Sequence, residues 1–214
     1  MHRVFIAINL PEEIKKELSS FQEKWPELPC RWTKKENLHI TLAFLGYLSD
    51  EELLEVLKII KEVAIRNSSF SINLKKICYG PPKKIPPRPP KFPEIVTEEK
   101  EWEQKFGRPR MVWVEGEKSE ELGKLQKDLE NSLLASSIRK GLPKPEARPY
   151  TPHITFGRIR AWEFRQIEPE ERPQVEEEIS LSFEVNSIEV MESQLKRGGA
   201  EYAVLETCSL RERN

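Results

Sequence analysis

The sequence predicts an α+β fold in which helices pack outside two sheets. Short apolar, β-branched segments typical of strands alternate with segments in which apolar residues recur at three- and four-residue steps, as on one face of a helix. A strand, a helix and a strand with a His-Ile-Thr unit follow one another in the first half, and roughly the same order returns in the second half. Mixed elements in this order favour two related half-units that share one core.

The first half of the chain is predicted to contain three strands and two helices. The strands cover residues 3–9, 38–46 and 70–79. Pro11 begins the first helix, whose first turn is acidic, and Ser49 caps the second through a Ser-Asp-Glu-Glu capping box. The apolar residues predicted to face inward are Ile14, Leu18 and Phe21 in the first helix and Leu53, Val56, Leu57 and Ile60 in the second.

The second half is predicted to open with a strand at residues 111–117. Ser119 begins a helix that Gly141 and Pro143 end. Residues 150–160 then form the second strand with a His-Ile-Thr unit. The leucines that recur on one face of the helix are Leu122, Leu125, Leu129 and Leu133.

The C-terminal part is predicted to form a polar loop followed by two strands. The loop covers residues 163–178, where prolines interrupt a charged segment. The strands cover residues 179–191 and 201–210. The two glycines at 198–199 mark a hairpin turn between them, and Arg197 is expected to belong to this turn.

Residues 81–110 differ in composition from the rest of the chain. Eight prolines lie between Pro81 and Pro109, in a segment that is basic at its start and acidic in its middle. We interpret it as a surface insertion in a single domain that spans residues 1–214, polyproline-like at first and with a short helix at residues 98–106. A proline-rich ligand for a partner domain is the alternative interpretation.

Composition excludes several classes of protein. The 214-residue chain has a formal net charge of −1, so its overall charge does not favour non-specific binding to nucleic acid. No apolar run approaches the roughly 18 residues that span a membrane, and the N-terminus lacks a secretory pattern. Three scattered cysteines are therefore expected to be reduced thiols in a cytoplasmic protein: Cys30, Cys78 and Cys208.

Two of the three histidines lie in the repeated His-Ile-Thr unit, within LHITLAFLG and PHITFGRIR. Side chains alternate across a strand, so His39 shares a face with Thr41, and His153 shares a face with Thr155. The opposite faces are predicted to be apolar, with Leu38, Ile40, Leu42 and Phe44 in the first strand and Ile154 and Phe156 in the second. The small residues expected on the polar faces, where they leave room for a ligand, are Ala43 and Gly157.

If the two strands lie side by side, two imidazoles and two hydroxyls line one cleft. A neutral histidine accepts a proton and a protonated one donates it, and the ordinary pKa of about 6.5 lets both forms coexist near neutral pH. This set suits acid–base chemistry at a phosphate without a metal ion. The alternatives are two unrelated strand histidines, or a metal site for which the sequence offers no Cys-x-x-Cys or His-Glu-x-x-His motif. The third histidine, His2, is expected to be a surface residue near the first strand.

These residues resemble the 2H phosphoesterase superfamily, which is named for two His-x-Thr motifs, and within it the RNA 2',3'-cyclic phosphodiesterases of bacteria and archaea, also known as 2'-5' RNA ligases. The resemblance covers most of the chain, in the segments RVFIAINLPEEIKKEL, RWTKKENLHITLAFLG, RMVWVEG, PHITFGRI and KRGGAEYAVLE. It implies a bilobed α+β fold with an antiparallel sheet and outer helices in each lobe. It also implies that both motifs lie in the cleft between the lobes.

The resemblance implies an activity and a role for each motif residue. The activity is hydrolysis of an RNA 2',3'-cyclic phosphate to a 2'-phosphate without metal or cofactor, together with a weak, reversible 2'-5' ligase activity. His39 is expected to donate a proton to the leaving 3' oxygen, and His153 is expected to accept a proton from water. Thr41 and Thr155 are expected to bind phosphate oxygens. Because the site is nearly symmetric, the two proton roles are easily exchanged.

Three further residues have two interpretations each. Arg158 resembles an arginine that follows the second motif in some relatives, and it is either a substrate-binding residue at the phosphate or a surface arginine. Strict alternation directs it away from His153, and a bulge at Gly157 would re-aim it. Phe44 is expected in the core, with stacking on a base as the alternative, and for Trp32 both interpretations stay open.

The leading hypothesis is an RNA 2',3'-cyclic phosphodiesterase that acts as a monomer on RNA ends, tRNA fragments included, with no membrane contact. The alternatives are a phosphodiesterase for 2'-5' oligoadenylate or a non-RNA cyclic nucleotide, and an RNA-end binding module. The proline-rich insertion departs from the family, whose members join the two flanking strands more directly. It could extend the RNA path, act as a lid or be inert, and its basic residues include Lys83, Lys84, Arg88 and Lys91.

Overall fold

The computed structural model describes residues 1–81, 109–136, 138, 150–197 and 199–213. The predictions for the proline-rich insertion, including its short helix, fall almost entirely outside these ranges. The strands of the described part are β1 (His2–Asn9), β2 (Cys30–Trp32), β3 (His39–Leu48), β4 (Phe70–Gly80), β5 (Met111–Gly116), β6 (His153–Ile159), β7 (Glu176–Val185), β8 (Ser187–Lys196) and β9 (Gly199–Ser209). Its helices are α1 (Glu12–Ser20), α2 (Asp50–Arg66), α4 (Glu120–Ala135) and α5 (Ala161–Arg165), and its 3₁₀ turns are η1 (Phe21–Lys24), η2 (Lys35–Asn37) and η4 (Pro169–Glu171).

The nine strands of the described residues pair into one antiparallel sheet with two halves. One half has the order β3-β1-β8-β9, the other has the order β6-β5-β4-β7, and β2 pairs with β6. The halves meet where β3 lies beside β6, with Ile40 opposite Ile154. The predicted α+β fold with antiparallel strands is confirmed, and the two predicted sheets are the two halves of one continuous sheet.

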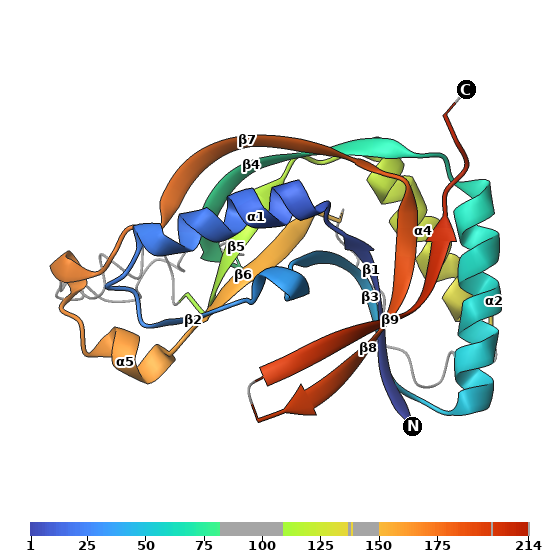
Figure 1. Cartoon of the computed structure of the whole chain (residues 1–214), viewed down its shortest axis with the longest axis horizontal. Helices are drawn as coiled ribbons and strands as arrows, with labels where there is room; N and C mark the ends of the chain where they lie inside the picture. The colour runs from blue at the N-terminus through green and yellow to red at the C-terminus, as the bar shows by residue number, and fades with distance from the viewer. Residues whose placement is uncertain (82–108, 137, 139–149, 198, 214) are drawn as a thin grey trace, which may run out of the picture.

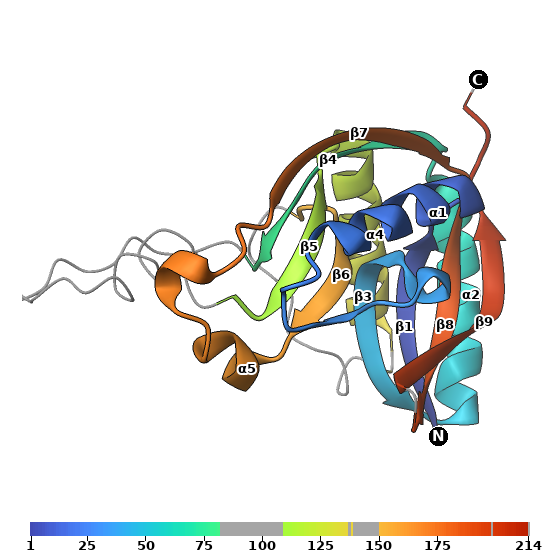
Figure 2. The ribbon, with the colours of Figure 1, turned by 60° about the vertical axis from the view of Figure 1, so that its left-hand side comes forward.

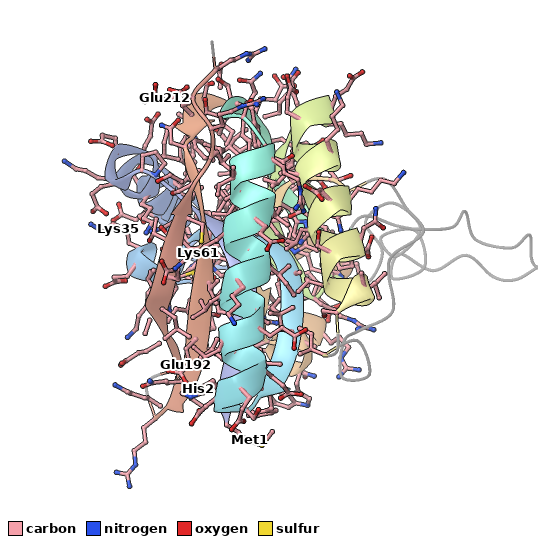
Figure 3. The ribbon with its side chains drawn as sticks, turned by 90° about the vertical axis from the view of Figure 1, so that its right-hand side faces the viewer. Met1, His2, Lys35, Lys61, Glu192 and Glu212 are labelled. Atoms are coloured by element: carbon pink, nitrogen blue, oxygen red, sulfur yellow. The ribbon has the colours of Figure 1, made fainter. Side chains whose placement is uncertain are left out.

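The sheet is strongly curled. Figure 1 shows β7 and β4 arching over one side while β1, β8 and β9 stand on the other, and Figure 2 shows β3, β1, β8 and β9 as neighbouring strands. Helices α2 and α4 lie side by side against the sheet (Figure 3). The main hydrophobic core contains Val56 of α2 and Leu125 of α4 together with Ile6 of β1 and Val114 of β5, so it extends under both halves of the sheet.

Local sequence signals determine where the two long helices begin. The Ser49 hydroxyl accepts a hydrogen bond from the backbone N–H of Glu52, and the Glu52 carboxylate accepts one from the backbone N–H of Ser49, which completes the predicted capping box of α2. Ser119 caps α4 by accepting from the N–H of Leu122. The inward faces predicted for the helices are confirmed, because every residue predicted there is buried or packs against the core.

Residues 179–191, predicted as one strand, belong to two strands in different halves of the sheet. β7 pairs with β4 and β8 pairs with β1, so the chain crosses between the halves at Asn186. The Asn186 carbonyl accepts a hydrogen bond from the N–H of Leu210 at 2.8 Å. Apolar residues fall at odd positions from Ile179 to Val185 and at even positions at Ile188 and Val190, and this change of phase was the sequence signal for two strands.

Three shorter predictions are also wrong. Helix α4 ends at Ala135, well before Gly141, where the Ser136 hydroxyl donates to the Leu133 carbonyl at 2.6 Å. Helix α5 begins two residues before the predicted polar loop and extends into it, because Phe164, only 4% exposed, anchors it to the core. β2 forms between the first helix and the first motif strand, where no strand was predicted, because it pairs with the second motif strand.

Candidate active site

The two His-x-Thr motifs lie at the junction of the half-sheets. The isoleucine pair at this junction is fully buried on the core side. Continuing its antiparallel register by one residue in each direction places His39 level with Thr155 and Thr41 level with His153. These four side chains share the face opposite the isoleucines, so each histidine lies beside the threonine of the other motif.

The His39 ring is held in one tautomer by the backbone of η2, which precedes its strand. Its Nδ1 lies 2.7 Å from the carbonyl oxygen of Asn37, and because a carbonyl only accepts, Nδ1 carries the proton. Nε2 lies 2.9 Å from the Thr41 hydroxyl and accepts a hydrogen bond from it. Burial lowers the pKa of His39, the hydrogen bond to Asn37 opposes this, and the charges of Lys15 and His153 lower the pKa further. The neutral ring is therefore favoured in the free site.

Aromatic rings and the β8–β9 hairpin surround His39. The ring centroid of Phe5 lies 5.0 Å from that of His39, and Tyr202 of β9 lies 5.2 Å away at an interplanar angle of 88°. On the same strand, the Ala200 carbonyl accepts a hydrogen bond from the side-chain amide of Asn37 at 2.9 Å. Strand β9 thus contacts both the His39 ring and the residue whose carbonyl determines the tautomer of His39.

The His153 ring has the same backbone partner but a different neighbour. Its Nδ1 lies 3.0 Å from the carbonyl oxygen of Thr151, so it also presents Nε2 toward the site. Trp113 of β5 stacks on it at 4.1 Å between centroids and 23° between ring planes. The Tyr150 hydroxyl donates to the Thr41 carbonyl at 2.5 Å and ties the segment before β6 to β3. The two motifs are therefore held together by side chains as well as by strand pairing.

Strand β6 contains a bulge at Phe156. Thr155 pairs with Trp113, but Gly157 pairs with Val112, which leaves Phe156 as the extra residue. Its carbonyl accepts a hydrogen bond from the backbone N–H of Thr33 at 2.9 Å. A bulge shifts the alternation of the residues that follow, so their faces differ from those that a regular strand predicts.

This bulge changes the faces predicted for two residues. Gly157 lies on the buried face and not beside His153, and a Cβ at this position would come within 2.4 Å of the Cys30 sulfur. The expected room for a ligand is therefore filled by Cys30 and Trp32, the latter packing against the core. Arg158 pairs with Met111 on the site face, because the bulge lies at Phe156, one residue before the predicted Gly157. Burial raises the pKa of the Cys30 thiol to about 12, which disfavours its thiolate form near neutral pH.

Strand β3 also departs from strict alternation. Its pairing with β1 skips Leu42 and Leu45, which marks two bulges. Ala43 consequently packs against the core, and Phe44, predicted in the core, is 63% exposed. Leu45 takes the core position, while the Phe44 ring lies 6.2 Å from Phe5 on the site face. The prediction that Phe44 is a core residue is wrong because the sequence does not show where a strand bulges.

Sequence reasoning missed the aromatic residues that contact the two histidines. Trp113 alternates with buried valines in MVWVEG, so its position on the site face of β5 was readable from that pattern. Phe5 lies in a strand that is buried on both faces, and Tyr202 comes from a hairpin far along the chain. Neither carried a local signal for contact with His39. Arg197 is an exposed turn residue, as predicted.

His2 lies apart from the site, at the far end of β1 (Figure 3). Its ring nitrogens contact Glu192 at 2.7 Å and Asp50 at 3.0 Å, and these hydrogen bonds raise its pKa, Glu192 most strongly. In the part of the chain that the structure describes, no three His, Cys, Asp or Glu side chains gather in a way that could hold a metal ion. The helices of these same ranges are too short or too polar to cross a membrane.

Two family models match the chain. The model of the LigT-like phosphoesterases matches residues 8–90, and the model of the 2'-5' RNA ligase superfamily matches residues 102–197. The first range contains His39 and Thr41, and the second contains His153 and Thr155. Each matched range thus includes one of the two motifs.

Individual relatives match over nearly the full length. The RNA 2',3'-cyclic phosphodiesterase of Methanocaldococcus jannaschii is 27% identical over 95% of this chain and 98% of its own, and that of Thermotoga maritima is 28% identical over 96% and 94%. A crystal structure from Thermus thermophilus gives a TM-score of 0.72 at 26% identity and covers 99% of this chain and all of its own. Escherichia coli LigT complexed with 3'-AMP gives a TM-score of 0.68 at 24% identity over 98% of both chains, and so shows the same fold.

Proposed function

Because the chain belongs to the LigT-like phosphoesterases of the 2'-5' RNA ligase superfamily, we propose that it hydrolyses the 2',3'-cyclic phosphate at an RNA end to a 2'-phosphate. The relatives compared above are named for this activity. The observation that carries the proposal is the placement of two His-x-Thr motifs on one face of the β3–β6 junction. There a single phosphate can contact two imidazoles and two hydroxyls.

In the proposed reaction, the two histidines supply both proton transfers. Nε2 of His153 accepts a proton from water as the water oxygen forms a bond to phosphorus. The bond from phosphorus to O3' breaks, and His39 donates its proton to O3', which leaves a 3'-hydroxyl and a 2'-phosphate. The hydroxyls of Thr41 and Thr155 donate to the non-bridging oxygens as these gain charge. The reaction written this way uses no metal ion and no cofactor.

A bound phosphate also explains how His39 can be protonated when it acts as a proton donor. The donor role needs the protonated ring, whereas burial lowers its pKa in the free site. The negative charge of a cyclic phosphate favours the protonated ring and raises this pKa on binding. Arg158, on the same face as the second motif, supplies a guanidinium that can bind the phosphate. If the 5'-hydroxyl of another RNA replaced water, the same steps would form a 2'-5' phosphodiester.

The test is hydrolysis of nucleoside 2',3'-cyclic monophosphates in the presence of a chelator, with the position of the product phosphate determined by NMR. We expect a 2'-phosphate product, and a loss of roughly a hundredfold or more in each of His39→Ala and His153→Ala. Ile65→Ala, a change at an exposed residue of α2, is the control for folding.

The other hypotheses give different results in the same assay. Turnover of 2'-5' oligoadenylate but not of cyclic phosphates would show that the same site acts on a different substrate. Tight binding of RNA ends without turnover, unaffected by either histidine change, would contradict an enzymatic role. Loss of activity with the chelator would contradict the metal-free reaction.

We also propose that the chain acts as a monomer in the reducing environment of the cytoplasm. Both motifs come from one chain, so the site is complete without a second copy. Cys30, Cys78 and Cys208 are all free thiols. RNA fragments with cyclic phosphate ends, tRNA fragments among them, are the substrates that this proposal expects.

A further inference from the structure

Lys15 is a charged residue in the interior of the protein. It shares the buried face of α1 with Ile14 and Leu18, and it is only 7% exposed. A buried ammonium group is costly unless hydrogen bonds or opposite charges compensate it, so lysines are almost never fully buried without a partner. The groups around Lys15 therefore indicate why a charge is kept at this position.

The ammonium group of Lys15 contacts the backbone that holds His39. Its Nζ lies 3.5 Å from the carbonyl oxygen of Glu36 in η2, to which it donates. The next residue, Asn37, has the carbonyl that accepts a hydrogen bond from Nδ1 of His39 at 2.7 Å. Burial lowers the pKa of His39, and the charge of Lys15 lowers it further. Lys15 thus lies one residue from the carbonyl that determines the His39 tautomer, and its charge acts on the ring.

Glu189 provides an opposite charge from β8. It is 8% exposed and lies opposite Ala7 of β1, two residues before Asn9, which is itself opposite His39. Opposite and alternate residues share a face, so Glu189 lies on the face of the sheet that carries His39. Burial raises the pKa of Glu189, whereas a hydrogen bond with the Asn9 side chain and the charge of Lys15 lower it. Because its buried Oε2 has no hydrogen-bond partner among the described residues, Glu189 depends on that positive charge.

Several charges act on Lys15 and His39 in this region. Burial lowers the pKa of Lys15, and the carboxylates around it favour its charged form. The charged groups that act on Lys15 are Glu12 on the same helix, Lys35 and Glu36 of η2, and Glu189. The titratable groups that act on or face His39 are Lys15, His153 of β6 and Tyr202 of β9. Three carboxylates and one lysine thus surround an ammonium group beside a histidine that must change its charge.

We propose that Lys15 is a positioning residue for His39, which holds the η2 backbone, and with it the Asn37 carbonyl, against the imidazole ring. A carbonyl that stays in place keeps the proton on Nδ1 and presents Nε2 to the phosphate. The ammonium charge also opposes protonation of the ring until an anionic substrate binds, so proton binding by His39 is coupled to substrate binding. The role in catalysis rests on the proposed function, whereas the tautomer and titration of the ring can be measured without a substrate.

The first test observes the His39 ring in the free protein. Nitrogen–proton NMR correlations report the tautomer and titration of a histidine ring, and the signals of His39 are those lost in His39→Ala. In Lys15→Met we expect a mixture of tautomers and an upward shift in the pH at which the ring is protonated, because a positive charge is removed. Lys15→Arg keeps the charge and should resemble the wild type. Lys16→Met is the matched control, because Lys16 is the exposed neighbour on the same helix.

A second variant separates the charge of Lys15 from the stability of the fold. Lys15→Met leaves the Glu189 carboxylate buried without its opposite charge, which destabilises the protein. Lys15→Met combined with Glu189→Gln removes both charges and should show the same upward shift. An unchanged tautomer and titration of His39 in both variants would overturn the proposal, and so would an equal change in Lys16→Met.

Kinetics on a nucleoside 2',3'-cyclic monophosphate test the consequence for catalysis. In Lys15→Met we expect kcat to fall about tenfold or more, with less change in KM and recovery in Lys15→Arg, because a small misplacement of a catalytic group slows the reaction strongly. An unchanged kcat in a variant whose His39 ring has shifted would contradict a positioning role. Absence of turnover in the wild type would count against the proposed function, whereas the NMR spectra would still decide whether Lys15 positions the His39 ring.

Discussion

His39 and His153 donate from Nδ1 to the carbonyl of the residue two positions earlier, at 2.7 and 3.0 Å, but their rings lie in different surroundings. His39 is enclosed by Phe5 and by Tyr202, which reaches it from the C-terminal hairpin. His153 stacks flat on Trp113 of the neighbouring strand. The same strand geometry thus produces the same tautomer twice, while distant parts of the chain give each ring its own environment.

This difference bears on how the two histidines can act. A tautomer held by the backbone presents Nε2 of both rings to one phosphate, which symmetric acid–base chemistry needs. The different surroundings of the two rings then give a physical basis for different roles, as in other acid–base pairs. In this chain burial lowers the pKa of His39, and strand β9 is part of that enclosure.

The largest expected effect tests whether the two histidines form one unit. If each proton transfer depends on the other, His39→Ala combined with His153→Ala should be about as slow as the slower single variant, a loss between roughly a hundredfold and ten-thousandfold. Single-turnover rates on a cyclic phosphate would measure this. If the losses of the two single variants multiply in the double variant, the two histidines contribute independently and do not act as one unit.

A smaller effect is expected from moving the ring under His153. A Cβ at Gly80 would lie 2.4 Å from the Trp113 indole, so Gly80→Ala must displace Trp113. Overpacking of this kind costs about 1–3 kcal/mol of stability, and we expect kcat to fall while KM changes less. Gly123→Ala is the matched control, because nothing lies within 4 Å of its added Cβ and alanine favours a helix by roughly 0.5–1 kcal/mol. Equal kcat in the two variants would show that the stacking does not position His153.

The smallest expected effect is a shift in the pH at which kcat/KM falls when the surroundings of His39 are changed. His39 must be protonated to donate, and burial lowers its pKa, so kcat/KM of the free enzyme should fall as the pH rises through a value below about 6.5. Tyr202→Leu admits water to the ring and should move this limb upward, toward the ordinary value. Val204→Ala, at an exposed residue of the same strand, should leave it in place. If activity instead rises through that pKa as the pH increases, His39 is the base and the two roles are exchanged.

Parts of the site could be predicted because they depend on neighbours in sequence. The alternation of side chains placed His39 with Thr41 and His153 with Thr155, and the register at the strand junction agrees with it. Alternation failed at Phe44 and Gly157, because both follow a bulge. A bulge is set by how two strands pair, which the residues of one strand do not encode.

The sequence by itself determined the α+β class, the capped helices with their apolar faces, and the two repeated motifs. Each of these depends on periodicity, capping or strand alternation, which act over a few residues. Only the tertiary structure decided that one predicted strand divides at Asn186 between two half-sheets, that β2 brings Arg31 opposite Arg158, and that Tyr202 encloses His39. These contacts join residues far apart in the chain. Their formation depends on how the curled sheet buries its apolar face, which no local pattern specifies.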